Sequence, residues 1–139
     1  MTHNNLGVAL RSQGERSSGE ESVRLLAEAV TAFREALKVY SAEDSQRQWV
    51  MVQNNLGIAL MRQGERTGGE EGRKLLSEAV VAYREALRFQ PIREGRLPLQ
   101  HAQGRSFPWS TDEIGMILPN LGKALKLQGE RSVGEEGRM

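Results

Sequence analysis

Nearly the same sequence occurs twice in this chain of 139 residues, and a more altered third copy follows. NNLGVALRSQGER occupies residues 4–16, and NNLGIALMRQGER follows at residues 54–66, so 50 residues separate equivalent positions. The related sequence NLGKALKLQGER occupies residues 120–131, 65 residues after its counterpart in the second copy. Internal repetition with a period of about 20 to 50 residues indicates stacked structural units. This repetition constrains the fold more than any single motif does.

Each copy predicts a first helix. Leu56 and Leu60 are spaced as on one face of a helix, with Met51 and Val52 before them. Gly64 follows, and because glycine adopts the left-handed conformation that ends many helices, it predicts that this helix stops near Gln63.

A second helix is predicted in each copy by a capping box, in which Ser or Thr is followed three residues later by Glu. The pairs are Ser17 and Glu20, Thr67 and Glu70, and Ser132 and Glu135. Beyond the first two pairs, apolar residues form one helical stripe. The stripe comprises Leu25, Leu26, Ala29, Val30, Phe33, Ala36 and Leu37, and 50 residues later Leu75, Leu76, Ala79, Val80, Tyr83, Ala86 and Leu87.

The pattern predicts an all-α fold in a single domain, with repeat one at residues 1–41 and repeat two at 45–91. An irregular insert at 92–110 and a partial repeat three at 111–139 complete the chain. Ser110 and Glu113 form another capping box, so we expect a helix restarting near Thr111, with Pro119 bending it or making a second start. In the insert, Leu97, Phe107 and Trp109 favour docking on the repeats, although a loose surface loop is the alternative.

The second copy resembles the tetratricopeptide repeat (TPR). The matching residues, in the order and nearly the spacing of the TPR pattern, are Leu56, Gly57, Ala79, Tyr83, Ala86 and Pro91. The doubled Asn and the long repeat are similar to the kinesin-light-chain-like type and to long repeats beside caspase-like effector domains in bacteria. The resemblance implies an α-α superhelix, a TPR-like solenoid of about two and a half helical hairpins. Gly7, Gly57 and Gly122 would allow close helix approach.

Composition and charge argue against several classes of protein. The net charge is +1, from 19 basic and 18 acidic residues, so no uncompensated basic run indicates nucleic acid or an anionic membrane as a partner. The chain lacks cysteine, and neither His3 nor His101 has a second ligand or a nucleophile at a diagnostic spacing. We therefore expect no enzyme activity, no cofactor and no metal. The N-terminal sequence lacks a secretory apolar stretch, which favours the cytoplasm.

The repeated asparagines are the candidate binding residues. On a helical wheel, Met51, Ile58 and Arg62 fall on the same side as Asn55, away from Leu56. The resemblance implies that this side lines a concave groove, where the asparagine bonds the backbone of an extended peptide. The predicted groove residues are Asn5, Met51, Asn55, Ile58, Arg62, Asn120 and Lys123. Alternatively, each asparagine bonds the neighbouring helix and fixes the stacking register.

We expect a protein-protein interaction module that binds an extended peptide or a partner helix in the groove. Arg62 and Lys123 mildly favour an acidic partner. The alternatives are a structural segment of a longer repeat array and a regulatory domain that supports a linked effector enzyme. Because about three repeats are usually needed for stability, the terminal helices predict marginal stability or self-association, which light scattering would detect.

Overall fold

A computed structural model describes residues 2–41, 45–88 and 111–136 of the chain, with side chains from 117 to 130 in the last segment. These residues form helices and short connections, and no β-strand occurs among them. The helices are α1 (Thr2–Arg16), α2 (Gly19–Val39), α3 (Gln46–Arg66), α4 (Gly69–Leu87) and α5 (Thr111–Glu136). The predicted all-α class is therefore confirmed. The insert at 92–110, including the expected docking of Trp109, lies outside the described residues.

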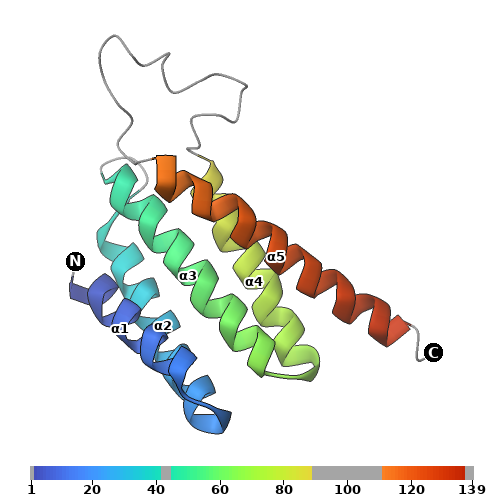
Figure 1. Ribbon diagram of the computed structural model, residues 1–139. Helices are drawn as coiled ribbons and strands as arrows, with labels where there is room; N and C mark the ends of the chain where they lie inside the picture. Colours follow the sequence, from blue (N-terminus) through green and yellow to red (C-terminus); the bar gives the residue numbers. More distant parts are fainter. Residues whose placement is uncertain (1, 42–44, 89–110, 137–139) are drawn as a thin grey trace.

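The five helices lie in two layers. Figure 1 shows α1, α3 and α5 side by side in one layer, with α2 and α4 behind them. Contacts join α1 to α2, α2 to α3, α3 to α4 and α4 to α5, and α3 also touches both α1 and α5. The first helix of every repeat thus belongs to one layer, which we call the first-helix layer.

The core lies between the layers and repeats with the sequence. The two second helices bury the same positions, as the apolar stripe predicts. These positions are Leu25, Leu26, Ala29, Val30, Phe33 and Ala36 in α2, and Leu75, Leu76, Ala79, Val80, Tyr83 and Ala86 in α4. Burial of each large apolar side chain contributes about 1.5–3 kcal/mol relative to exposure. Packing of these stripes, more than helix propensity, holds the hairpins together.

Two glycines permit the closest approach of the layers. A Cβ atom on Gly7 would lie 2.5 Å from Cε1 of Phe33, and one on Gly57 would lie 2.6 Å from Cε1 of Tyr83. The prediction of close helix approach is confirmed for these two positions. The described residues do not test it for Gly122, where an added Cβ meets none of their atoms within 4 Å.

The ends of the helices differ from the sequence prediction. Gly64 does not end the first helix, since α3 continues to Arg66. Instead, Gly64 is buried with its Cβ position 3.0 Å from Cγ of Leu76, so it serves packing. The left-handed glycines are Gly19 and Gly69, with φ of 64° and 66°, which are the first residues of α2 and α4. The turn therefore lies several residues later than predicted.

The capping boxes predicted at Ser17, Thr67 and Ser132 are also wrong, and the one predicted at Ser110 lies outside the described residues. The Ser17 hydroxyl donates to the carbonyl oxygen of Gln13 at 2.9 Å, closing the end of α1 instead of opening α2. Ser18 and Gly68 occupy the N-cap positions, and neither makes a side-chain cap hydrogen bond. Ser132 lies inside α5. The predicted restart at Thr111 is confirmed, but Pro119 makes no second start because α5 runs through it.

Candidate functional site

The repeated asparagines lie in the first-helix layer, where neighbouring repeats meet. The amide of Asn55 donates from Nδ2 to Oδ1 of Asn4 at 3.1 Å, joining α3 to α1. Asn120 donates from Nδ2 to Oδ1 of Asn54 at 3.5 Å, joining α5 to α3. In both cases the asparagine directly before the repeated Leu-Gly pair donates to the first asparagine of the preceding repeat, although Pro119 stands before Asn120 in the third copy. We call this pair of bonds the amide ladder.

The amide ladder bonds neighbouring helices, as the register alternative requires. Asn4 is 3% exposed, so its oxygen depends on the bond from Asn55 for a partner. A side-chain amide also has two N–H groups and two lone pairs on its oxygen, so one bond does not exhaust it. Asn5, the equivalent of Asn55 in repeat one, is exposed. Peptide binding by these residues remains a prediction.

A row of charges crosses the same layer. Arg11 and Arg62 both contact Oε2 of Glu15, at 3.4 and 3.1 Å. Arg62 also contacts Glu65 at 3.0 Å, and Lys123 of α5 lies 3.8 Å from the other oxygen of Glu65. This ion row links α1, α3 and α5 through residues from all three repeats.

Arg62 is the centre of the ion row. Burial opposes its charge, but hydrogen bonds to Glu65 and Glu15, together with the attraction of both carboxylates, outweigh burial and raise the pKa of the guanidinium. Its planar fork suits two carboxylates at once, as lysine would not. The predicted positive charges of Arg62 and Lys123 are therefore partly compensated by acidic neighbours.

The remaining predicted groove residues differ in accessibility. Lys123 is exposed, whereas Met51 and Asn120 are half-buried. Ile58 is 7% exposed and belongs to the core cluster, so it offers little surface to a ligand.

Sequence reasoning did not find Glu15 and Glu65. The available signal was the QGER sequence, which places a glutamate at the same position of every copy: Glu15, Glu65 and Glu130. The partner of each glutamate could not be read from one copy, because the pairing crosses between repeats. Arg11 was missed for the same reason, since its equivalent in repeat two is Met61.

A buried hydroxyl lies behind the first-helix layer. Tyr83 is 0% exposed, and its oxygen has no hydrogen-bond partner among the described residues. Burial raises the pKa of the Tyr83 phenol, although the positive charges of Arg62 and Arg11 act in the opposite direction. Phe33 fills the equivalent position in repeat one without a hydroxyl. The difference shows that the ring, not the hydroxyl, is what the packing needs.

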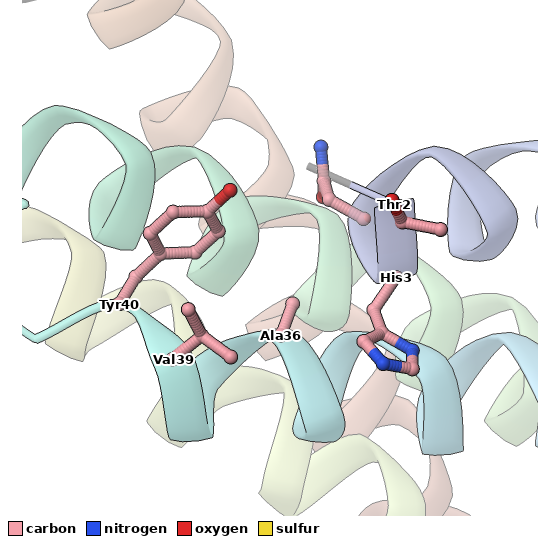
Figure 2. A pocket seen from close by; sticks show the side chains of 6 residues that line it. Thr2, His3, Ala36, Val39 and Tyr40 are labelled. Carbon is pink, nitrogen blue, oxygen red and sulfur yellow. The ribbon is translucent and has the colours of Figure 1, made fainter.

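A small pocket lies at the repeat-one end of the molecule, with a volume of about 260 Å³. Figure 2 shows Thr2 and His3 of α1 together with Ala36, Val39 and Tyr40 at the end of α2. His3 has no carboxylate among the other lining residues. In the part of the chain that the structure describes, no group of three or more His, Asp or Glu is arranged to hold a metal. The same part contains no helix that is both long and apolar enough to cross a membrane.

Comparison of the chain with protein-family models, with curated proteins and with solved structures gives no match. The resemblance to TPR therefore rests on the residues of the second copy quoted above.

Proposed function

We propose that this protein is a protein-protein interaction module, built as a TPR-like solenoid, and that its first-helix layer binds an extended peptide or a helix of a partner protein. The observation that carries the proposal is the amide ladder with the adjacent ion row. Both bring polar side chains from three successive repeats to one layer. A partner lying across the repeats would meet similar groups at regular intervals.

The chemistry of this layer suits a polypeptide. Amide side chains donate and accept hydrogen bonds, as a peptide backbone does, so they bind it without regard to its side chains. The ion row contains three basic groups, Arg11, Arg62 and Lys123, against the two acidic groups Glu15 and Glu65, which leaves one positive charge. This excess mildly favours an acidic partner. We infer action by binding in the cytoplasm, without catalysis or a cofactor.

Selection from a displayed peptide library tests this proposal, followed by affinity measurements on variants that keep the ladder intact. The double variant Asn5→Ala with Lys123→Ala removes two exposed groups of the layer. We expect affinity to fall about tenfold, since each lost hydrogen bond or ion pair costs about 0.5–1.5 kcal/mol. Val81→Ala, at an exposed position of α4, is the matched control and should have no effect. Selected peptides that bind the double variant and wild type equally would contradict the proposal.

A second candidate is a structural segment in a larger repeat array or beside an effector enzyme. The amide ladder favours it, because the bonds that it makes hold one repeat against the next. The two candidates differ in their prediction for Asn5. As a purely structural segment, the protein would enrich no peptide from the library, and Asn5→Ala would leave every binding measurement unchanged.

A further inference from the structure

The ion row is tighter at one junction between repeats than at the other. Between α1 and α3, Oε2 of Glu15 lies 3.1 Å from Nε of Arg62 and 3.4 Å from Nη1 of Arg11. Between α3 and α5, Nζ of Lys123 lies 3.8 Å from Oε2 of Glu65. That distance is longer than an ordinary N–H···O hydrogen bond of about 2.7–3.2 Å. The charged groups at the junction of α3 with α5 are therefore held more loosely.

The sequence of the third copy explains the difference. The residue equivalent to Arg62, 65 positions later, is Leu127, so the third copy has no arginine at that place. The basic group at this junction comes instead from Lys123, one helical turn earlier in α5. A lysine ammonium is a compact charge on a flexible stem, whereas an arginine fork holds two oxygens in a fixed geometry. Glu65 is thus bound firmly by Arg62 of its own helix and weakly across the repeats.

The two basic side chains retain donors for a further carboxylate. Arg62 donates through Nε to Glu15 and through Nη1 to Glu65, while its Nη2 donates to no atom of the described residues. The ammonium of Lys123 has three N–H groups, yet within the described chain it contacts only Glu65. The side chain of Lys123 is 47% exposed, so these donors are accessible from solution.

The position of Glu65 shows that a carboxylate fits between these basic groups. Its Oε1 accepts from Nη1 of Arg62 at 3.0 Å, and its Oε2 lies toward Lys123. The side chain of Glu65 is 26% exposed, so water reaches it. Ion pairs that water reaches, and pairs three residues apart on one helix, contribute little to stability. The carboxylate of Glu65 can therefore leave this place at small cost.

We propose that Glu65 is an internal competitor of an acidic partner: its carboxylate occupies Arg62 and Lys123 in the free protein, and an aspartate or glutamate of the partner replaces it. This inference rests on the proposed function and adds to it a residue that lowers affinity. Because Glu65 is tethered beside its basic groups, a single free carboxylate competes poorly with it. The partner that fits is a segment with several acidic residues, which offers a replacement wherever it lies.

The acidic occupant is supplied more readily by a partner than by the longest segment of the chain outside the described residues. That segment, residues 89–110, contains three arginines and one glutamate. Its net charge is therefore positive, and it would be repelled by Arg62 and Lys123 instead of replacing Glu65.

The test measures the fluorescence anisotropy of a labelled peptide of ten glutamates with the full-length protein at low ionic strength, and a peptide of ten glutamines is the uncharged reference. Glu65→Gln should bind the glutamate peptide about fivefold more tightly than wild type, because one negative charge beside the bound carboxylate is removed. Adding Lys123→Ala to Glu65→Gln should abolish this gain. Neither variant should change the affinity for the glutamine peptide.

Glu78→Gln is the matched control, because it makes the same change of charge in the other layer, where Glu78 pairs with Arg34 at 2.6 Å. It should leave the affinity for the glutamate peptide unchanged. Circular dichroism checks that the variants keep their helix content. Lys123→Ala alone gives a second readout in a protein that retains Glu65, and it should weaken binding of the glutamate peptide.

Three results would overturn the inference. The first is no binding of the glutamate peptide to Glu65→Gln, and the second is an equal gain from Glu65→Gln and Glu78→Gln, which would indicate a general effect of net charge. The third is a gain that persists without the ammonium of Lys123. Failure of the proposed function is distinguishable from these results, because it is the failure of a displayed library to enrich any peptide. Enrichment of neutral peptides that bind wild type and Glu65→Gln equally would keep the interaction module and overturn the competitor.

Discussion

At the scale of single residues, contact between glycine and an aromatic ring sets the spacing of each hairpin. The ring of Tyr83 is fully buried, and Cε1 lies 2.6 Å from the Cβ position of Gly57. Such a ring cannot move aside, because a core packed as densely as a crystal leaves it no free volume. The helices are as close as this pair allows, and any side chain at position 57 would force them apart.

Gly57→Ala should therefore destabilise the protein despite the higher helix propensity of alanine. Overpacking costs about 1–3 kcal/mol, whereas the propensity gain is about 1 kcal/mol. Gly122→Ala provides the matched control, because its Cβ meets no atom of the described residues within 4 Å, and it should raise the free energy of unfolding by about 0.5–1 kcal/mol. Urea unfolding measures both, and a stabilised Gly57→Ala would contradict the packing argument.

Tyr83→Phe should stabilise the protein by about 1 kcal/mol at neutral pH, since the buried hydroxyl lacks a partner among the described residues. It should also change the response to alkali. Because burial raises the pKa of Tyr83 above its ordinary value of 10.0, the unfolded chain releases this proton first. The stability contributed by the protonated phenol is present below pH 10.0 and is lost above it, by about 1.4 kcal/mol per pH unit.

Urea unfolding from pH 8 to 11 measures this loss. Wild type should lose stability more steeply than Tyr83→Phe above pH 10.0. Parallel decline of the two proteins would mean that burial does not raise the pKa of Tyr83, for example because the charges of Arg62 and Arg11 stabilise the phenolate as much as burial opposes it.

At the scale of helices and turns, the sequence predicted more about the helix bodies than about their ends. The apolar stripes of α2 and α4 can be predicted from the helical spacing of their apolar residues alone, because a helix that buries one face needs apolar residues at that spacing. The Ser17 prediction failed because the hydroxyl of a serine bonds equally well to a carbonyl four residues earlier, which it does at Gln13. Helix ends depend on which of several nearby backbone groups a side chain bonds, and the repeated sequence does not show which one is chosen.

Gly69→Ala should therefore cost about 1–2 kcal/mol, because Gly69 begins α4 with a φ of 66°, where an L side chain is strained. Gly68→Ser is the matched control. It introduces the residue found at the equivalent position of repeat one, where Ser18 has extended backbone, and it should be neutral or slightly stabilising. Thermal unfolding gives the melting temperatures of the two variants, which we expect to be lower for Gly69→Ala than for Gly68→Ser. Equal melting temperatures would show that the turn adjusts to alanine.

The candidate site was predicted in part, for a related reason. Asn55 and Arg62 were identified from one copy by their place on the helical wheel. Their partners Asn4 and Glu15 belong to the preceding repeat, and only the stacking of α3 on α1 brings them within reach. The residues of a repeat interface can thus be identified from sequence, whereas their pairing depends on the register between repeats.

A double-mutant cycle on Asn4→Ala and Asn55→Ala measures that register contact. We expect a coupling free energy of about 0.5–1.5 kcal/mol in urea unfolding, the usual net contribution of one hydrogen bond. The control cycle pairs Asn5→Ala with Asn55→Ala and should show additive effects, since Asn5 is exposed. Additive effects in both cycles would mean that the amide ladder contributes nothing to stacking.

At the scale of the whole molecule, the helices of the first-helix layer differ in how many of their residues are buried. α3 lies between repeats and buries ten residues along its length, including Trp49, Val52 and Leu60. α1 buries only Asn4, Gly7 and Gly14, and in α5 an added Cβ at Gly122 or Gly129 meets no described atom within 4 Å. In a stack of this kind each unit is stabilised by its neighbours, so local stability should follow the number of neighbours that each helix has.

Hydrogen exchange should therefore be slowest in the amides of α3 and faster in α1 and α5. Local opening of α1 or α5 breaks contacts with two other helices, whereas opening of α3 breaks its contacts with α2 and α4 together with those to α1 and α5. Mass spectrometry of peptides from each helix, at several urea concentrations below the unfolding transition, measures the order of opening. Equal protection of all three helices would instead indicate a single cooperative unit, in which the amide ladder and the ion row couple the edges to the centre as strongly as the core does.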